Sequence, residues 1–292
     1  MHPAAFAYSA PGTLDEALRS LHELGDDGRV LAGGQSLIPM MKLRLAEPGH
    51  LVDINGIAEL AGVHAEDGYL RIGALARHAD VAASPVVRAA NPTVWTAAQW
   101  VADPLVRNRG TVCGSVAHCD PEGDWNSVML AVGATVVARS AGGGERLIPH
   151  REFVVDYFTN ALETGEMVTE IRVPSSTGPA GGTYLKLERK VGDYATVGVA
   201  VHLVLAPDGR IGRAGIALTA VSPRNLAVPE AEQLLVGAEP GPELFAQAAD
   251  VAARSCSPDS DVRGPADYKR AVVAAYTRRA LDAALAQARA AA

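Results

Sequence analysis

Ala32-Gly33-Gly34-Gln35-Ser36 and Thr111-Val112-Cys113-Gly114-Ser115 are two glycine-centred stretches, and each places glycine beside a small hydroxyl residue at the expected end of a strand. Glycine lets the backbone approach a ligand closely and adopt positive φ. Successive backbone N–H groups in such a turn form a concavity that binds anions. Two turns of this kind suit a diphosphate held from two sides, and they indicate a large nucleotide cofactor.

The common nucleotide-binding patterns are absent from the sequence. Neither stretch matches the Gly-x-Gly-x-x-Gly pattern of dinucleotide-binding folds or the Gly-Lys-Ser/Thr ending of a phosphate loop. A single Gly-Gly turn is more often structural than ligand-binding. Two turns with flanking hydroxyl groups weaken this structural alternative but leave it open.

Length, charge and hydropathy exclude several classes of protein. The 292 residues are 48% hydrophobic, which is enough for two domains or one large one. The net charge of −7 argues against nucleic acid as the main partner. No secretory signal is evident, and apolar runs such as 197–205 are too short to span a bilayer. We expect a cytoplasmic protein without a membrane span.

The three cysteines, Cys113, Cys119 and Cys256, show no metal-binding pattern. Their spacing fits no zinc site, and an iron–sulfur cluster normally needs four thiolates. They are typical of reduced thiols in a cytosolic protein. The sequence therefore predicts no metal site in this chain.

Strand and helix signals alternate through the first part of the chain. Residues 13–24 predict a helix with a capping box, and the glycine-rich stretch 141–145 predicts a hairpin turn. Pro104 is expected to end a helix at 87–102. The other expected helices are 37–43, 87–102, 126–132 and 151–157, and the expected strands are 29–32, 50–54, 69–73, 135–139 and 167–173.

The pattern changes after a segment rich in proline, serine and glycine at 174–182, which is the best candidate for a domain boundary. Strands followed by helices predict an α+β domain beyond it. The expected strands are 183–190, 196–205 and 210–221, and the expected helices are 229–235, 243–254 and 267–289.

Three groups of residues share a known sequence pattern. They are 32–42 continued by 51–55; 111–115 with 117–121 and Asp124; and 184–186 with 189–195. In this order, and over nearly the whole chain, they resemble the FAD-binding medium subunits of molybdenum hydroxylases. This family includes the medium chain of carbon monoxide dehydrogenase and the FAD domain of xanthine dehydrogenase.

The resemblance implies an α+β fold of two domains. Residues 1–175 would form an FAD-binding domain of the vanillyl-alcohol-oxidase-like, PCMH type, with two α/β subdomains that divide near residue 58. Residues 180–290 would form a smaller α+β domain like the C-terminal domain of the carbon monoxide dehydrogenase flavoprotein.

The resemblance also implies which residues bind FAD. The two glycine stretches would hold the diphosphate through backbone N–H groups, and Tyr194 would cover the flavin ring. No residue of the chain is expected to be catalytic by itself. The expected FAD-binding residues are Ala32, Gly33, Gly34, Gln35, Ser36, Leu37, Thr111, Cys113, Gly114, Ser115, Asp124, Lys186 and Tyr194.

Three of these side chains, and also His118, have structural alternatives when they are considered without the resemblance. Asp124 could cap a helix, Lys186 could face solvent, and Tyr194 could be a packed aromatic residue. His118 is more typical of a core histidine than of a catalytic one. Cys113 departs from the family, which usually has a second glycine there, and cysteine would disfavour positive φ at that position.

The function implied by the resemblance is electron transfer. Electrons from 2Fe-2S clusters on a small subunit would reach FAD in this chain and then an external acceptor, while a large subunit carries the molybdenum-pterin cofactor. The implied assembly is a heterotrimer, often dimerised. Two alternatives stay open: a self-sufficient FAD-dependent oxidoreductase, and a non-redox assembly module with a degenerate flavin site, for which Cys113 is the only hint.

Overall fold

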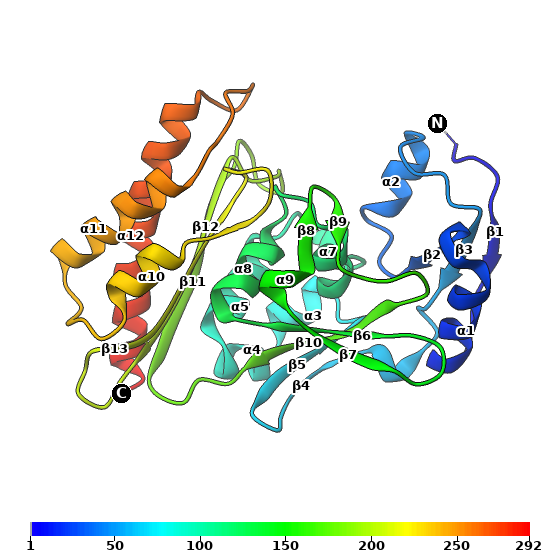
Figure 1. Cartoon of the computed structure of the whole chain (residues 1–292), viewed down its shortest axis with the longest axis horizontal. Coiled ribbons are helices and arrows are strands. Elements are labelled where there is room, and N and C mark those ends of the chain that lie inside the picture. The colour runs from blue at the N-terminus through cyan, green and yellow to red at the C-terminus, as the bar shows by residue number, and fades with distance from the viewer. Residues whose placement is uncertain (1) are drawn as a thin grey trace.

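The computed structural model describes residues 2–292, in which helices pack around several β-sheets (Figure 1). The N-terminal part is a parallel sheet in the order β1-β3-β2. The helix over it begins at the predicted capping box, because Thr13 Oγ1 accepts from the N–H of Glu16, and the Glu16 carboxylate accepts from the N–H of Thr13. The elements are β1 (Ala7–Ser9), α1 (Leu14–Leu24), η1 (Gly25–Asp27), β2 (Gly28–Leu31), α2 (Leu37–Lys42), β3 (His50–Asp53) and η2 (Ala58–Leu60).

The second part is an antiparallel sheet in the order β4-β5-β10-β6-β7, with helices α3 to α8 between β5 and β6 in the chain and α9 after β7. Strand β10 lies in the centre because the chain returns after β9 to pair with both β5 and β6. Its strands are β4 (Val63–Glu66), β5 (Tyr69–Gly73), β6 (Thr135–Arg139), β7 (Glu145–Pro149) and β10 (Met167–Pro174), with the small pair β8 (Val154–Asp156) and β9 (Thr159–Asn160) beside it. Its helices are α3 (His78–Ala83), α4 (Pro85–Ala90), α5 (Pro92–Trp100), α6 (Pro104–Arg107), α7 (Val112–His118), α8 (Asp124–Val132) and α9 (His150–Phe153).

The third part is an antiparallel sheet in the order β11-β12-β13-β14, followed by three helices. Every residue of β12 is buried, as expected for a strand that is covered on both faces and is apolar except for His202. The elements are β11 (Ala180–Leu187), β12 (Val197–Leu205), β13 (Ile211–Thr219), β14 (Leu226–Ala227), α10 (Pro229–Leu235), α11 (Pro242–Ser255) and α12 (Ala266–Ala290).

This third sheet lies between two layers of helices. Helix α12 packs along β11 and β12 on one face, while α5 and α8 of the second part pack on the other (Figure 1). The approach of α5 and α8 is close, because a Cβ at Gly215 would collide with the carbonyl of Ala131, and a Cβ at Gly182 would collide with Thr93 Oγ1. Glycine at these two positions of the sheet therefore lets the helices approach it.

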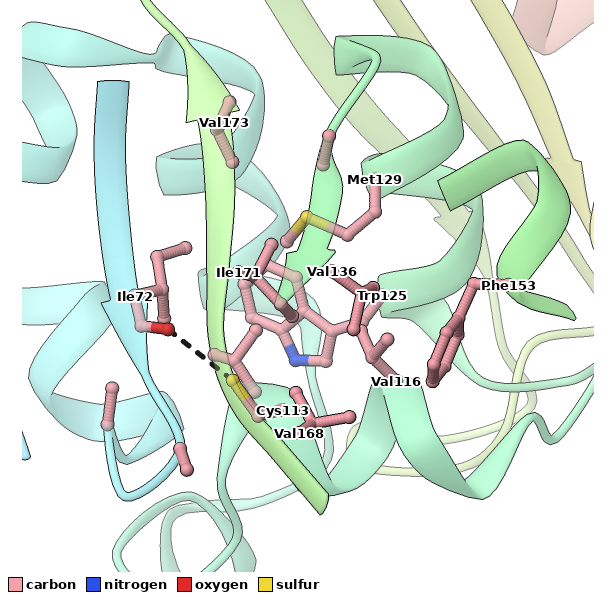
Figure 2. Packing of buried hydrophobic residues seen from close by; sticks show 14 of the residues in the cluster. Ile72, Cys113, Val116, Trp125, Met129, Val136, Phe153, Val168, Ile171 and Val173 are labelled. Atoms are coloured by element: carbon pink, nitrogen blue, oxygen red, sulfur yellow. Dashed lines mark hydrogen bonds between the residues drawn. The ribbon is translucent and has the colours of Figure 1, made fainter. Parts of the chain in front are cut away.

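Two hydrophobic cores follow this arrangement. The first surrounds Trp125 and Phe153 and continues between β5, β10 and helices α7 and α8 (Figure 2). The second is formed by β12, β13 and the C-terminal helices, with Phe245 and Leu281 among its fully buried side chains. The predicted combination of helices and sheets, with an α+β C-terminal part, is confirmed.

The predicted single helix 87–102 is wrong, because the chain breaks it at Asn91-Pro92. Proline disfavours helical backbone at the residue before it, and Asn91 is extended. The Asn91 side chain accepts a hydrogen bond from the N–H of Val94 and so caps α5. Pro104 likewise begins the short helix α6 and does not end a helix.

The predicted helix 151–157 is also largely wrong. Helix α9 ends at Phe153, and β8 begins at once with Val154 and Val155, whose β-branched side chains favour a strand. The predicted hairpin turn at 141–145 is confirmed, since β6 and β7 pair on either side of it.

Three buried histidines make the stability of the fold sensitive to acid. Desolvation lowers the pKa of His78 to about 3 and the pKa values of His150 and His202 to about 4. In the unfolded chain histidine titrates near 6.5, so the unfolded state binds more protons once the pH falls below about 6.5. Each histidine then removes about 1.4 kcal/mol of stability per pH unit, until the pH reaches its folded-state pKa.

We expect His150→Leu to reduce this loss of stability, because it removes one of the contributing histidines. Neither ring nitrogen of His150 has a hydrogen-bond partner within residues 2–292, so leucine sacrifices no bond. The free energy of urea unfolding at pH 7 and pH 5 measures the change. The matched control is His64→Leu at an exposed position. An unchanged pH dependence in His150→Leu would contradict the prediction.

Candidate cofactor site

The first glycine stretch connects β2 to α2 and contains a backbone conformation that favours glycine. Gly34 has a φ of 71°. Gly33 packs directly against another segment, since a Cβ there would collide with the carbonyl oxygen of Arg109 and lie 2.7 Å from Gly110 Cα. The segment that carries Arg109 and Gly110 leads straight into the second glycine stretch. The two stretches, about eighty residues apart in the sequence, therefore meet in space.

The first stretch offers a row of free donors. No backbone carbonyl of residues 2–292 accepts a hydrogen bond from the N–H groups of residues 33–37. Backbone N–H groups are strong donors that nearly always find a partner in protein, water or ligand. Consecutive free N–H groups beside a glycine of positive φ form a concavity for anions, which fits a diphosphate.

The second stretch is a helix start, and the prediction of a second glycine turn is wrong. Thr111 is the N-cap of α7, and its Oγ1 accepts from the N–H of Gly114 at 3.1 Å. A Cβ at Gly114 would lie 2.7 Å from that oxygen, so glycine fits the cap closely. Ser115 follows in the first turn of the helix, and its N–H bonds the carbonyl of Thr111. The N–H groups of Val112, Gly114 and Ser115 are all bonded within the protein, so the second side presents a helix N-terminus and not a second row of free donors.

Cys113 is accommodated without backbone strain. It lies in the first turn of α7 and is not among the residues with positive φ. Its thiol points into the first core, where Sγ donates to the carbonyl of Ile72 at 3.4 Å (Figure 2). Burial raises the pKa of this thiol, which is therefore a neutral core side chain. The concern that cysteine at this position opposes a required positive φ is removed.

Asp124 and Lys186 form a buried ion pair between the second and third parts of the fold. Lys186 Nζ lies 3.0 Å from Asp124 Oδ2 and 3.5 Å from Glu188 Oε2. Tyr184 donates from its hydroxyl to Asp124 Oδ1 at 2.7 Å. Desolvation raises the pKa of Asp124, and it raises the pKa of Tyr184 well above its ordinary value.

The structural alternatives for these two residues are wrong. Asp124 is the first residue of α8, and Gly123 is the cap. Lys186 does not face solvent, since only 2% of its side chain is exposed. An open cavity of about 410 Å³ lies beside it, and Trp100 and Glu188, which contact Lys186, form part of the cavity wall.

Tyr194 lies in the loop between β11 and β12 and is 48% exposed, so it is not a packed core residue. Partial burial and the nearby carboxylates of Asp120, Glu122 and Asp124 raise the pKa of its hydroxyl to about 12. An exposed aromatic ring of this kind is available to stack on a ligand. His118 packs against the ring of Phe158 at 4.9 Å between centroids, which suits a structural role.

Sequence reasoning missed three residues of the site, Asn55, Arg77 and Tyr184. Asn55 and Tyr184 lie inside stretches that resemble the family, but nothing marked them as separate from their neighbours. Arg77 lies outside all of these stretches, and its side chain donates to the carbonyl of Arg109 and to Asn55 Oδ1, each of which lies beside one glycine stretch. Such side-chain bonds to distant backbone or side-chain groups leave no pattern in a sequence.

Comparison with known families identifies the class of protein. Residues 4–176 match the FAD binding domain in molybdopterin dehydrogenase. Residues 182–284 match the CO dehydrogenase flavoprotein C-terminal domain. The chain therefore belongs to the family of FAD-binding medium subunits of molybdenum hydroxylases, and the resemblance drawn from the sequence is confirmed. It is an oxidoreductase subunit with an FAD-binding domain.

Particular relatives cover almost the whole chain. The carbon monoxide dehydrogenase medium chain of Hydrogenophaga pseudoflava is 42% identical over 98% of this chain and 99% of its own length. The 6-hydroxypseudooxynicotine dehydrogenase complex subunit alpha of Paenarthrobacter nicotinovorans is 36% identical over 99% and 97%. A solved structure of carbon monoxide dehydrogenase from Hydrogenophaga pseudoflava, which lacks the Mo-pyranopterin moiety of the molybdenum cofactor, matches with a TM-score of 0.93 and 43% identity over 98% of this chain and 99% of that one.

Proposed function

We propose that this chain is the electron-transfer subunit of a molybdenum-containing hydroxylase or dehydrogenase, in which electrons from 2Fe-2S clusters of a small subunit pass by way of FAD to an external acceptor. The observation that carries the proposal is the meeting of the two glycine stretches beside a row of free backbone N–H groups. This arrangement fits the diphosphate of FAD, which distinguishes it from flavins with one phosphate or none.

The diphosphate site would be built from backbone on one side and from a helix start on the other. Residues 33–37 would donate from successive N–H groups, and α7 would add its N-terminus with the hydroxyls of Thr111 and Ser115 nearby. Cys113 would contact the diphosphate only through its backbone, because its thiol is buried in the first core and donates to the carbonyl of Ile72. Arg77 and Arg109 supply positive charge beside this space; burial lowers the pKa of Arg77, and the charge of Arg109 lowers it further.

The rest of the site would orient the flavin. Tyr194 would cover one face of the ring and restrict water, and Lys186 with Asp124 would fix a polar wall. FAD, when bound, supplies chemistry that links one-electron donors to two-electron acceptors, while the protein contributes binding and electrostatics. No residue of this chain is assigned a catalytic role.

The proposal also covers organisation and partners. Residues 1–175 would bind FAD in two subdomains that divide near residue 58, between β3 and β4, and residues 180–290 would form the C-terminal domain. The partners would be an iron–sulfur small subunit and a molybdopterin large subunit in a heterotrimer, in the cytoplasm. Among residues 2–292, no helix is long and apolar enough to cross a membrane.

The test is to purify the full chain with the chains that accompany it. We expect bound FAD in this chain, together with molybdenum and iron–sulfur clusters in its partners, and flavin reduction by substrate only in the complete complex. A well-folded complex that never retains FAD would contradict the proposal. Substrate-dependent flavin bleaching by this chain alone would instead support a self-sufficient oxidoreductase.

A further inference from the structure

The side chain of Asn55 is fixed by three hydrogen bonds, two from its Nδ2 and one to its Oδ1. Its Nδ2 donates to the carbonyl of Ala32 at 2.8 Å and to Asp53 Oδ1 at 2.6 Å. Its Oδ1 accepts from Arg77 Nη2 at 2.6 Å. The two acceptors on one side and the donor on the other allow only one orientation of the amide. Asn55 therefore joins the first glycine stretch to Arg77.

Arg77 extends this connection to the second glycine stretch. Its Nη1 donates to the carbonyl of Arg109 at 2.5 Å, and its backbone forms a β-bridge with Thr111, the cap of α7. The charged groups that face Arg77 are Arg109, Asp80 and Asp53. One planar guanidinium thus contacts Asn55, which bonds the first stretch, and the carbonyl of Arg109, two residues before the second stretch.

Peptide geometry links these contacts to the anion-binding donors. The carbonyl of Ala32 and the N–H of Gly33 belong to one planar trans peptide, so they point in opposite directions. When Asn55 holds the carbonyl, it turns the N–H of Gly33 away from itself. Arg77 holds the carbonyl of Arg109, the group against which Gly33 packs. The contact between the two stretches is therefore held from both sides.

We propose that Asn55 and Arg77 are positioning residues that hold the two glycine stretches at the separation and orientation required to bind a diphosphate. This inference rests on the proposed binding of FAD. Neither side chain needs to touch the cofactor, since Asn55 acts through the carbonyl of Ala32 in the first stretch and Arg77 through the carbonyl of Arg109 just before the second. The expected effect of losing either is weaker FAD binding with little change in the stability of the flavin-free protein.

The experiment compares FAD affinity in Asn55→Ala, Arg77→Lys and Arg77→Gln, each in the full chain with its copurifying partners after removal of flavin. Lysine keeps the charge but cannot span two acceptors with a planar fork. Arg210→Lys is the matched control, because Arg210 also donates to a backbone carbonyl, that of Gly237, but in the C-terminal part. Flavin fluorescence gives the dissociation constant, and urea unfolding gives the stability.

We expect the dissociation constant for FAD to rise about tenfold in Asn55→Ala and in Arg77→Lys, as for the loss of a hydrogen bond with a charged partner. Saturating FAD should restore the wild-type flavin absorption spectrum, and Arg210→Lys should bind as the wild type does. Wild-type affinity in Arg77→Lys together with weak binding in Arg77→Gln would show that charge alone matters and would overturn the inference. Wild-type affinity in all variants would also overturn it. Failure of the wild-type complex to bind FAD would instead refute the proposed function.

Discussion

Lys186→Met is expected to lower the free energy of unfolding by about 3–5 kcal/mol, because it leaves a buried carboxylate without its counter-ion. Asp124 is almost fully buried, and its remaining partner, the Tyr184 hydroxyl, does not neutralise its charge. Glu188, which also contacts Lys186, would lose the same cation. Urea unfolding of the flavin-free protein at pH 7 measures the loss without interference from ligand binding.

Two controls separate the buried charge from the loss of a side chain. In the double variant Asp124→Asn with Lys186→Met, the asparagine can still accept from Tyr184, so we expect much of the stability to return. Arg44→Met removes one partner of the exposed pair Arg44–Glu47, and it should cost less than about 1 kcal/mol. If Lys186→Met lowered the free energy of unfolding no more than Arg44→Met does, the prediction that an unpaired buried Asp124 is costly would be wrong.

The position of this ion pair gives it a second consequence. Asp124 begins α8 of the second part of the fold, and Lys186 lies near the end of β11 in the third. Ser127 of α8 extends the contact by donating to the carbonyl of Leu218 in β13. An unpaired charge at this interface disfavours the packing of the two parts against each other. We therefore expect Lys186→Met to lower the midpoint of urea unfolding and also to make the unfolding of the two parts less cooperative.

Local signals in the sequence predicted much of the fold. The capping box at Thr13 and Glu16 and the glycine hairpin after β6 depend on residues close together in the chain, and both appear where they were expected. The break at Asn91-Pro92 carried an equally local signal that the apolar periodicity around it obscured. Proline chemistry outweighs hydrophobic pattern at such a position.

The candidate site could be predicted only in part, because its contacts join distant residues. Asp124 and Lys186 are 62 positions apart, and the resemblance assigned each to the site without pairing them. The second glycine stretch was expected to form a turn because Gly114 suggested positive φ, whereas the Thr111 hydroxyl caps a helix there. The network through Asn55 and Arg77 depends on carbonyl orientations that exist only in the folded chain.

Gly33→Ala is expected to cause the largest loss of FAD binding among single substitutions of the first stretch. The added Cβ would collide with the Arg109 carbonyl oxygen and approach Gly110 Cα, and both are backbone atoms that cannot rotate away. Relief requires the two stretches to move apart, which would widen the proposed diphosphate site. Overpacking of this kind costs about 1–3 kcal/mol, so we expect the affinity for FAD to fall by about ten- to hundredfold.

Flavin content after purification and fluorescence titration with FAD measure the effect of Gly33→Ala. Gly241→Ala is the matched control, because no atom lies within 4 Å of the added Cβ and its backbone is extended. The same methyl group there should leave FAD binding unchanged. Full flavin retention in Gly33→Ala would mean that the contact between the stretches does not set the geometry of the site. Loss of flavin together with preserved folding would place that geometry in the backbone contact itself, where only glycine at residue 33 permits it.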